Sequence, residues 1–381
     1  MNGVEDGEAA RVARLASELR ERELDALVVA APLNLRYVTA FTGSHGLALV
    51  AADEGGGEST ATSASRSPGN RFFTDFRYTT QSAKQVPEVF SREIVTGSLL
   101  EAAARSLGNS GGRLGYDEAS TTVADRTRLT AALGEGWELV ESAGMIERLR
   151  AVKDEGEVER TRAAAKLADE ALQGVLEEGL VGRSERDVAI ELELRMRRLG
   201  AREPSFPSIV AFGAHGALPH AEPRGETIPR DVLVTIDWGA RLDGYCSDCT
   251  RTYATGEGIS ERAREVYELV LEAQRTGAQA VKAGPTGREV DAAAREVIER
   301  AGYGEQFGHG LGHGVGLNVH EAPRLSRVES EQPLQPGNVV TVEPGIYLPG
   351  ELGVRIEDLL VVRESGQEVL NGLEKALTVV S

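Results

Sequence analysis

The pattern of hydrophobic and polar positions changes character near residue 148. Before that point, a helical pattern over Glu8–Glu23 precedes an apolar strand, Leu24–Ala31, and strand-like segments follow at Leu47–Ala52 and Arg71–Asp75. Strands that alternate with helical stretches are typical of an α/β unit, and we predict one for this part of the chain.

Two connecting segments in this first part are predicted to be irregular. Pro32–Ser44 contains aromatic residues and ends in Thr-Gly-Ser, which predicts a loop that closes in a turn. Residues 54–70 are rich in Gly, Ser and Thr and hold almost no apolar side chain. They predict a mobile hairpin tip between the two flanking strands, because such a segment buries too little apolar area to order itself.

A helical pattern dominates from Met145 to Gly200, and strand-like segments follow it. Ser184-Glu-Arg-Asp187 is similar to a capping box at the start of a helix that ends at Gly200. Further helices are expected over Ser260–Ala283 and Thr286–Ala301, and the second again opens with a capping-box pattern.

The strand-like segments of this second part are apolar and do not alternate strictly with the helices. They are Val232–Trp238, Tyr245–Ala254, Val339–Glu343 and Arg355–Val362. This order predicts an α+β fold with a mainly antiparallel sheet. The sequence contains no tandem repeat at the periods of solenoids or propellers.

The composition is that of a globular protein, with 41% hydrophobic and 27% charged residues over 381 positions. Apolar runs such as Asp25–Ala31 are too short to span a bilayer. The N-terminus is acidic and lacks the basic and apolar stretches of a secretory signal, so we expect a cytoplasmic protein with no membrane partner. A formal charge of −18 argues against nucleic acid as a partner, because phosphate binding needs a concentrated basic surface.

The basic residues are five lysines against thirty-seven arginines. An acidic, lysine-poor surface suits a cell with high internal salt, where screening weakens self-repulsion. A GC-rich genome that favours Arg codons is the alternative explanation, and the sequence leaves both open.

The two cysteines, Cys246 and Cys249, form a C-x-x-C pair that invites a redox or metal interpretation. They lie in a strand-like segment, and residues three apart on a strand point to opposite faces. We therefore predict two buried, unpaired thiols. Two cysteines also cannot supply a four-sulfur zinc site.

Five of the six histidines fall between residues 215 and 320, and three of them lie in the run His309-Gly-Leu-Gly-His-Gly-Val-Gly-Leu-Asn-Val-His320. Its glycine spacing does not match the G-x-G-x-x-G of a dinucleotide site. So many glycines instead allow the backbone to approach a crowded site closely. Three histidines threaded through such a run indicate function rather than core packing, whereas His215 has no role that the sequence suggests.

Four carboxylates lie at the ends of apolar strands or inside them. Asp237 ends one such strand, Asp248 lies in the next, Glu343 follows a third, and Glu357 has apolar neighbours on both sides. The segment Gly239–Gly244 would join the first two strands as a hairpin, so that their acids converge on one face. Buried carboxylates are costly unless they are paired or bind metal, and the few nearby arginines cannot neutralise all four.

Two divalent cations would balance these four negative charges. Oxygen-rich ligation with one imidazole suits Mn²⁺, Co²⁺ or Zn²⁺, and two such ions can activate a shared water. A Ser/His/Asp hydrolase is the competing interpretation, but the sequence has no G-x-S-x-G elbow. It has no H-E-x-x-H zincin helix either, because His320-Glu321 is followed by Ala-Pro-Arg.

These motifs together resemble the aminopeptidase P, prolidase and methionine aminopeptidase superfamily of metallopeptidases. The segments that carry the resemblance are Ile236-Asp-Trp-Gly-Ala240, Ser247-Asp-Cys-Thr-Arg-Thr252, Gly312-His-Gly-Val-Gly-Leu-Asn-Val-His-Glu-Ala-Pro323, Val342-Glu-Pro-Gly-Ile-Tyr347 and Gly353-Val-Arg-Ile-Glu-Asp358. Looser matches resemble the creatinase-type N-terminal domain: Leu24-Asp-Ala-Leu27, Asn34-Leu-Arg-Tyr-Val-Thr39 and Thr74-Asp-Phe-Arg-Tyr78. The resemblance implies a creatinase-like α/β domain over residues 8–148 and a pita-bread α+β catalytic domain over residues 149–381.

The resemblance also implies roles for individual residues. The metal ligands would be Asp237, Asp248, His313, Glu343 and Glu357. Glu343 would also shuttle a proton from the bridging water to the leaving prolyl nitrogen.

Four further residues are implied on the substrate side. His220 and His320 would donate hydrogen bonds to the substrate or the developing oxyanion. His309 would line the substrate pocket, and Arg355 would orient a metal-bound carboxylate or a substrate group.

Within this superfamily the N-terminal domain, Arg355 and the three histidines of the glycine run favour hydrolysis of Xaa-Pro bonds in a proline-containing peptide. Two alternatives stay open at this stage, an aminopeptidase and a dipeptidase. A non-catalytic or non-peptidase creatinase-like relative that acts as a binding protein is the alternative from another class, although such relatives typically lose ligands. The family expectation for assembly is a homodimer.

Overall fold

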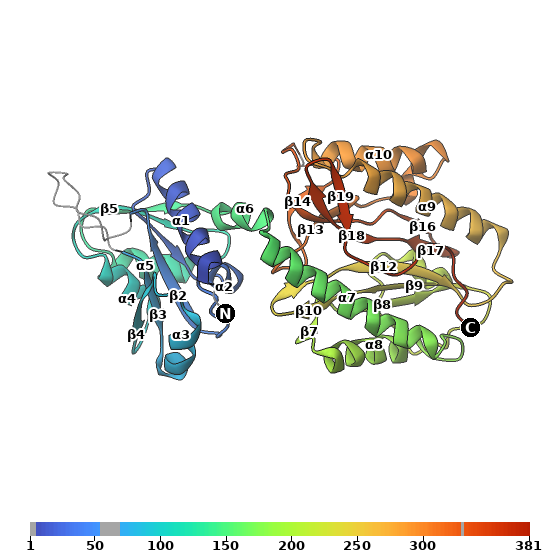
Figure 1. Cartoon of the computed structure of the whole chain (residues 1–381), viewed down its shortest axis with the longest axis horizontal. Helices are drawn as coiled ribbons and strands as arrows, with labels where there is room; N and C mark the ends of the chain where they lie inside the picture. Colours follow the sequence, from blue (N-terminus) through green and yellow to red (C-terminus); the bar gives the residue numbers. More distant parts are fainter. Residues whose placement is uncertain (1–4, 54–68, 329–330) are drawn as a thin grey trace. The chain divides into compact units, whose positions relative to one another are not determined.

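The structure is a computed structural model that describes residues 5–53, 69–328 and 331–381 (Figure 1). It divides into two compact units, one up to Arg150 and one from Ala151 to Ser381. Each unit has its own hydrophobic core. Most of the predicted hairpin tip, residues 54–68, lies outside the described residues.

The N-terminal unit is built on one six-stranded sheet with the strand order β4-β3-β2-β1-β5-β6. Its strands are β1 (Ala26–Val29), β2 (Gly46–Ala51), β3 (Arg71–Thr74), β4 (Ser91–Ile94), β5 (Gly112–Tyr116) and β6 (Trp137–Glu141). Its helices are α1 (Glu5–Glu21), α2 (Pro32–Thr39), the 3₁₀ turn η1 (Phe76–Tyr78), α3 (Thr79–Gln85), α4 (Leu99–Ser106), α5 (Val123–Ala132) and α6 (Met145–Ala151). Strand β2 is antiparallel to β1 and β3, and the other pairs are parallel, so the predicted α/β unit is confirmed.

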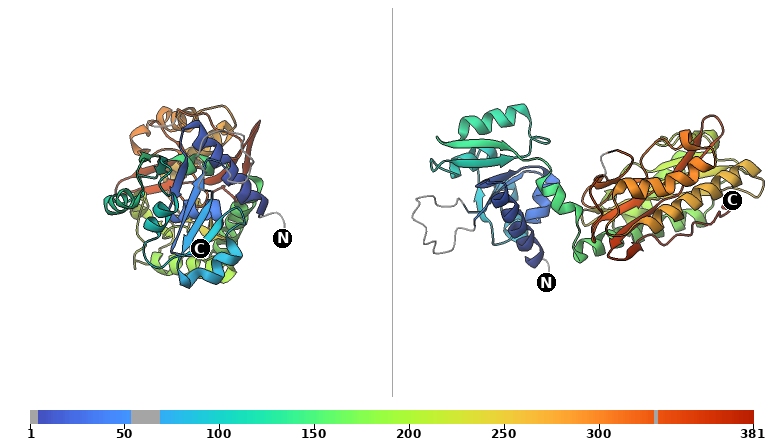
Figure 2. Two further views of the ribbon diagram at one scale, coloured as in Figure 1. Left: turned by 90° about the vertical axis from the view of Figure 1, so that its left-hand side faces the viewer. Right: turned by 90° about the horizontal axis from the view of Figure 1, so that it is seen from above.

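Both faces of this sheet are covered by helices (Figures 1 and 2). Alternate residues of β1 and β2, such as Val28 and Leu49, pack with Ala103 of α4 and Leu129 of α5. Helices α1 and α2 contact β2 as well. Because successive strand residues point to opposite faces, nearly all of β1 and β2 is buried, which explains their continuous apolar sequences.

The segment Pro32–Ser44, predicted as a loop, instead begins with helix α2. Pro32 occupies the first helical position, where its missing N–H costs nothing and its fixed φ suits the helix. The helix buries Leu35, Tyr37 and Val38, and it ends at Ala40 in the left-handed conformation. The loop prediction missed this short apolar face.

The C-terminal unit contains four small sheets in which every strand pair is antiparallel. Its strands are β7 (Glu203–Pro204), β8 (Ile209–Phe212), β9 (Leu233–Trp238), β10 (Ala240–Leu242), β11 (Tyr245–Cys246), β12 (Cys249–Ala254), β13 (Gly312–Gly314), β14 (Glu321–Leu325), β15 (Val339–Val342), β16 (Gly345–Leu348), β17 (Leu352–Arg355), β18 (Asp358–Arg363) and β19 (Gly366–Val369). Its helices are α7 (Glu155–Glu177), α8 (Glu185–Leu199), η2 (Gly213–Ala217), α9 (Glu261–Ala280), α10 (Gly287–Arg300) and η3 (Gly304–Gln306).

The helices of this unit form two pairs on opposite sides of the strands (Figure 1). Helices α7 and α8 pack against β8 and β9, where Leu172 and Leu192 share a cluster with Trp238. Helices α9 and α10 pack against β15, β17 and β18, where Val270 and Ile298 share a second cluster. The strands therefore lie in a layer between the two helix pairs.

The predicted helix starts are confirmed. The Ser184 side chain accepts from the Asp187 N–H, and α8 ends at Gly200 in the left-handed conformation. Thr286 and Glu289 form a complete capping box on α10.

Two of the predicted strands are each broken in the middle. Tyr245–Ala254 is interrupted between β11 and β12, and Arg355–Val362 is interrupted between β17 and β18. Asp248 lies in the first break and Glu357 in the second. A continuous strand would keep strict alternation, so each break frees an acidic side chain from the pleat that its apolar neighbours follow.

Cys246 and Cys249 are both buried and unpaired, as predicted. They belong to separate core clusters. Each thiol packs within its cluster and also donates to a backbone carbonyl, Cys246 to Leu317 and Cys249 to Glu357.

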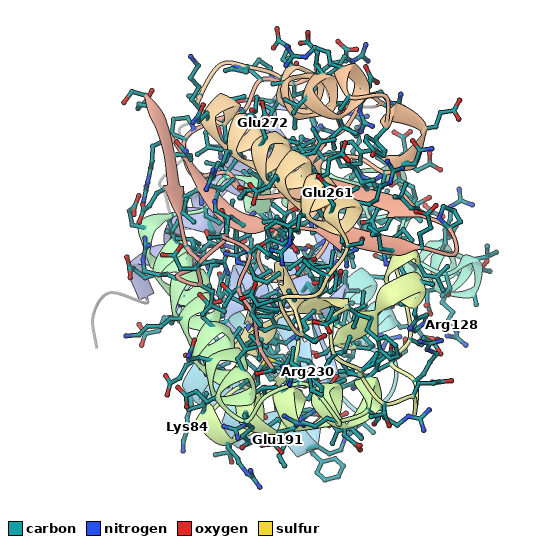
Figure 3. The ribbon with its side chains drawn as sticks, turned by 90° about the vertical axis from the view of Figure 1, so that its right-hand side faces the viewer. Lys84, Arg128, Glu191, Arg230, Glu261 and Glu272 are labelled. Carbon is teal, nitrogen blue, oxygen red and sulfur yellow. The ribbon has the colours of Figure 1, made fainter. Side chains whose placement is uncertain are left out.

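Charged side chains occupy the outer faces of the helices, for example Glu191 on α8 and Glu261 and Glu272 on α9 (Figure 3). Within the described residues, no helix is both long and apolar enough to cross a membrane.

Candidate metal centre

The four predicted carboxylates reach the site from strand ends and from breaks between strands. Asp237 lies near the end of β9, opposite Thr250 of β12. Asp248 and Glu357 lie in the two strand breaks, and Glu343 directly follows β15. The Glu357 N–H donates to the Thr250 carbonyl at 3.0 Å, which docks the second break against β12.

These carboxylates converge. One ligand oxygen each from Asp237, Asp248 and Glu357 lies within 4.8 Å of the others. His313 Nε2 lies 3.2 Å from Glu343 Oε1 and 3.6 Å from Asp248 Oδ2. The structure thus brings together all five side chains that the family resemblance singled out, and we call this group the acidic centre.

Glycine allows His313 to enter this crowded region. A Cβ on Gly312 would lie 2.1 Å from the Thr341 carbonyl oxygen, and a Cβ on Gly314 would lie 2.1 Å from the Ala322 oxygen. No side chain fits at either position, so the glycine run serves close backbone approach, as predicted. His313 is left as the one bulky residue of β13.

The acidic centre fits a divalent cation. The side chains of Asp248 and Glu357 are almost fully buried. Among the described residues, Asp237 Oδ1 and Glu357 Oε1 are buried without a hydrogen-bond partner. A buried carboxylate oxygen without a partner is expensive, and a bound cation would remove that cost.

The pKa values show the same imbalance of charge. Burial and the nearby Glu357 and Asp237 raise the pKa of Asp248 well above its usual range. Burial, Glu343 and Asp237 do the same to the pKa of Glu357. Burial would also raise the pKa of Glu343, but its contact with His313 brings that pKa down to about 2. The protein alone therefore supplies too little positive charge for all four carboxylates to ionise easily.

Arg355 supplies part of the missing charge. Its Nη2 donates to Asp237 Oδ2 at 2.7 Å, and its Nε donates to Thr250 Oγ1 at 3.1 Å. The Thr250 hydroxyl in turn donates to Glu357 Oε2 at 2.7 Å. One buried arginine thus contacts Asp237 directly and reaches Glu357 through the Thr250 hydroxyl.

A hydrogen-bonded chain connects His309 to this arginine. Tyr347 OH lies 2.9 Å from Arg355 Nη1 and 3.0 Å from His309 Nε2. His309 Nδ1 lies 2.8 Å from the Gly310 carbonyl oxygen and must donate there, so its Nε2 accepts from the tyrosine. Burial lowers the pKa of His309, which favours this neutral form.

His220 and His320 are both exposed. The ring of His320 packs edge-to-face on His313 with centroids 4.3 Å apart. His220 follows Pro219, whose carbonyl accepts from Arg355 Nη1 at 3.1 Å. Burial and the charges of His313 and His220 lower the pKa of His320.

Three hydroxyl residues of the site received no role in the sequence analysis. They are Thr250 and Tyr347, described above, and Thr341, whose hydroxyl accepts from the His313 N–H and donates to Glu343 Oε1 at 3.0 Å. Thr250 and Tyr347 lie inside segments that carry the family resemblance, and Thr341 directly precedes the segment Val342–Tyr347. Their positions therefore were visible in the sequence, but their contacts were not.

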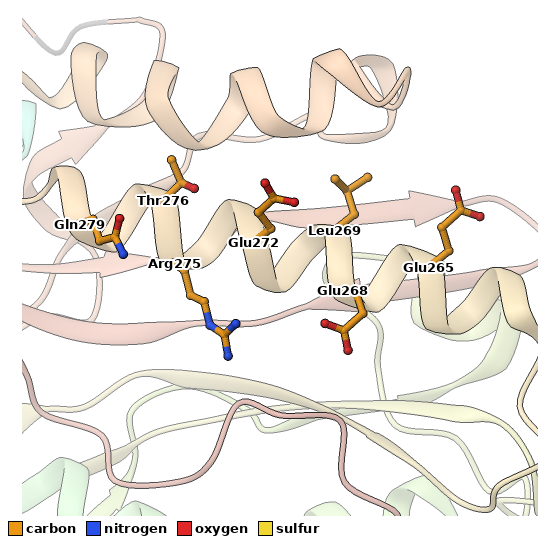
Figure 4. Close-up of a pocket in the computed structure, with 7 residues that line it drawn as sticks. All are labelled: Glu265, Glu268, Leu269, Glu272, Arg275, Thr276 and Gln279. Atoms are coloured by element: carbon orange, nitrogen blue, oxygen red, sulfur yellow. The ribbon is translucent and has the colours of Figure 1, made fainter.

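A groove on the outer face of α9 is separate from this centre (Figure 4). Glu265, Glu268, Leu269, Glu272 and Arg275 are among its lining residues, and every lining residue belongs to the same helix. None of the groove residues belongs to the acidic centre, and we assign the groove no part in its chemistry.

Comparisons with known proteins agree with the geometry. Residues 159–364 match metallopeptidase family M24, and residues 11–152 match the creatinase/prolidase N-terminal domain. The chain is 41% identical over 360 residues to the uncharacterized peptidase YqhT of Bacillus subtilis, covering 94% of this chain and 96% of that protein.

Two solved structures share the fold over almost the whole chain. An Xaa-Pro dipeptidase from Bacillus anthracis is 38% identical with a TM-score of 0.90, covering 98% of this chain and 99% of its own. An X-Pro aminopeptidase from Thermotoga maritima is 33% identical with a TM-score of 0.83, covering 94% of this chain and 98% of its own. The predicted pita-bread α+β fold is thereby confirmed, and the chain belongs to metallopeptidase family M24, with a creatinase/prolidase N-terminal domain ahead of its hydrolase unit.

Proposed function

We propose that this metallopeptidase hydrolyses Xaa-Pro peptide bonds with two divalent metal ions held by the acidic centre. The convergence of Asp237, Asp248, His313, Glu343 and Glu357, with two buried oxygens that lack a partner among the described residues, carries the proposal. The dipeptidase and aminopeptidase names of the two solved relatives support the proline specificity.

The donor set favours Mn²⁺ or Co²⁺, with Zn²⁺ as a further option, because it consists of carboxylate oxygens and one imidazole. Asp237, Asp248, His313, Glu343 and Glu357 would hold the ions. When bound, two such ions balance the four carboxylates, lower the pKa of a water between them and stabilise negative charge on the attacked carbonyl.

The chain itself supplies the proton transfer. Glu343 accepts a proton from the attacking water and delivers it to the prolyl nitrogen as the peptide bond breaks. The Thr341 hydroxyl donates to Glu343 Oε1 and so fixes the direction of this carboxylate. One residue acts first as base and then as acid.

His220 and His320 stabilise the substrate from the exposed side of the centre. Each imidazole N–H donates to the substrate carbonyl as its oxygen gains negative charge. His309, whose two ring nitrogens are both engaged, meets the substrate through its ring face. Arg355 orients Asp237.

Replacing Tyr347 with phenylalanine tests the chain from His309 to Arg355. The change removes one hydroxyl that contacts a charged guanidinium and keeps the ring, so kcat/KM should fall about tenfold or somewhat more. Steady-state kinetics on an Xaa-Pro dipeptide, with metal content checked in parallel, provide the measurement. A kcat/KM within about twofold of the wild type would show that the hydroxyl does no positioning.

The proposed function itself is tested by comparing an Xaa-Pro dipeptide with an Xaa-Pro-Yaa tripeptide, each with and without added Mn²⁺ or Co²⁺. We expect metal-stimulated cleavage of at least one of them, and no cleavage of a matched Xaa-Ala dipeptide. Cleavage of the tripeptide identifies an aminopeptidase, and cleavage of the dipeptide alone identifies a dipeptidase.

The same experiment separates the enzyme from a binding protein. A non-catalytic relative would bind the peptide without turnover in any metal. The absence of stimulation in metal-reconstituted protein would overturn the proposal.

A further inference from the structure

Glu185 is a fully buried carboxylate that lies outside the acidic centre. It is the first residue of α8, directly after the N-cap Ser184. A carboxylate is favoured at a helix N-terminus, but complete burial calls for several additional donors. Its side-chain exposure is 0%, and both of its oxygens are hydrogen-bonded.

The donors to Glu185 come from the two ends of one segment, residues 212–224. At the first end, the Phe212 N–H donates to Oε1 at 3.0 Å, and His215 Nδ1 lies 3.0 Å from both oxygens. At the other end, the Arg224 N–H donates to Oε2 at 2.9 Å, and the guanidinium donates to both oxygens at 3.1 Å. The Glu185 carboxylate thus joins the two ends of the segment, which we call its base.

The segment that is closed in this way presents His220. Between its two ends the chain makes the short helix η2, and Gly216 of that helix packs directly on Gly353 of β17. The carbonyl of Pro219 then accepts from Arg355. The segment is therefore held at its base by Glu185 and near its tip by Arg355, and the exposed His220 follows at once.

Burial would raise the pKa of Glu185, but the Arg224 guanidinium and the donors at both ends lower it. The carboxylate is therefore ionised at neutral pH, and each donor makes a charge-assisted hydrogen bond, which is stronger than a neutral one. This also gives a role to His215, which the sequence left unexplained.

We propose that Glu185, with His215 and Arg224, clamps the segment 212–224 and thereby fixes His220 beside the acidic centre. This inference rests on the proposed function of His220. Glu185 and His215 are positioning residues, because they act on the substrate only through the segment that they hold. A histidine that stabilises a transition state must be placed within a fraction of an ångström, so loosening its support lowers kcat more than it changes KM.

The test compares His215→Ala and Glu185→Gln with the control Glu226→Gln. The control removes the exposed second carboxylate near Arg224, 3.5 Å from its Nε, and leaves Glu185 intact. We expect kcat on an Xaa-Pro peptide to fall about 10- to 100-fold in the first two variants, with KM nearly unchanged, and to stay at the wild-type value in the control. His215→Asn should restore most of the activity, because its amide nitrogen can take the place of Nδ1.

A double-mutant cycle shows whether the effect passes through His220. If it does, adding His215→Ala to His220→Ala causes little further loss. If the two losses of kcat multiply in the double variant, the effect of His215 does not pass through His220.

Hydrogen–deuterium exchange of residues 213–223 measures the clamp without any turnover. Exchange should speed up in His215→Ala and Glu185→Gln, and should stay at the wild-type rate in Glu226→Gln. Unchanged exchange in the first two variants overturns the clamp even if the protein cleaves no Xaa-Pro peptide. Failure of the proposed function alone would leave wild-type turnover absent while the exchange difference persists.

Discussion

Replacing Glu357 with alanine is expected to abolish turnover, with a fall in kcat of about 1,000-fold or more. Glu357 is almost fully buried, and one of its oxygens has no partner within the described part of the chain. Its loss removes one ligand of the two proposed metal ions and leaves the Thr250 hydroxyl without its acceptor. Elemental analysis should show less metal bound per chain.

The control for this variant is Glu351→Ala. Glu351 is an exposed residue of the turn between β16 and β17 and should keep wild-type kinetics and metal content. Residual activity of more than about 1% of the wild type in Glu357→Ala would contradict the assignment of Glu357 as a ligand.

The melting temperature of the Glu357→Gln variant tests whether the buried Glu357 carboxylate destabilises the metal-free protein. Without metal, burial and neighbouring carboxylates raise the pKa of Glu357, so ionising this carboxyl group destabilises the fold. The contribution of the protonated Glu357 to the free energy of unfolding is fully present at acidic pH, and it is lost as the pH rises through the raised pKa. The neutral glutamine should therefore raise the melting temperature of chelated protein at neutral pH and remove the stabilisation that Mn²⁺ gives the wild type.

Replacing Arg355 with lysine is expected to lower kcat/KM about 100-fold. The guanidinium holds Asp237, Thr250 and Tyr347 at once and also binds the carbonyl of Pro219. A single ammonium cannot span these four acceptors, so Asp237 would lose its fixed orientation. We also expect half-maximal activation to need more Mn²⁺, which a metal titration of activity measures.

Arg363→Lys is the matched control for this substitution. Arg363 pairs with Glu155 and Glu368 at the surface, where ion pairs contribute little, so its kinetics should not change. Wild-type kcat and metal dependence in Arg355→Lys would mean that the charge alone, and not the fork geometry, matters at this position.

Much of the fold was predictable because it follows from short-range physics. The caps at Ser184 and Thr286 act within one helical turn. Strands that are covered on both faces bury all of their side chains and therefore have continuous apolar sequences. Asp237 and Glu343 lie at or directly after the ends of such strands, so these candidate ligands were visible in the sequence.

The breaks in the strands could not be predicted. Ser247 and Asp248, like Ile356 and Glu357, lie within sequences that read as continuous strands, and nothing local marks the interruption. Each break forms because the chain passes from one small sheet to another, and that depends on partners far away in sequence, such as the Thr250 carbonyl that accepts from the Glu357 N–H. Helix α2 shows the converse case, in which a short buried apolar face forms a helix where the sequence suggested a loop.

The sequence by itself therefore determined the class of the fold, the helices with their caps, and the identity of the acids and histidines that could form a metal centre. Only the tertiary structure decided how these residues are supported. Arg355 and Asp237 are 118 positions apart, and Glu185 lies 39 positions before Arg224. Periodicity and capping describe interactions over a few residues, whereas these hydrogen bonds exist only once the strands have paired and buried the charges together.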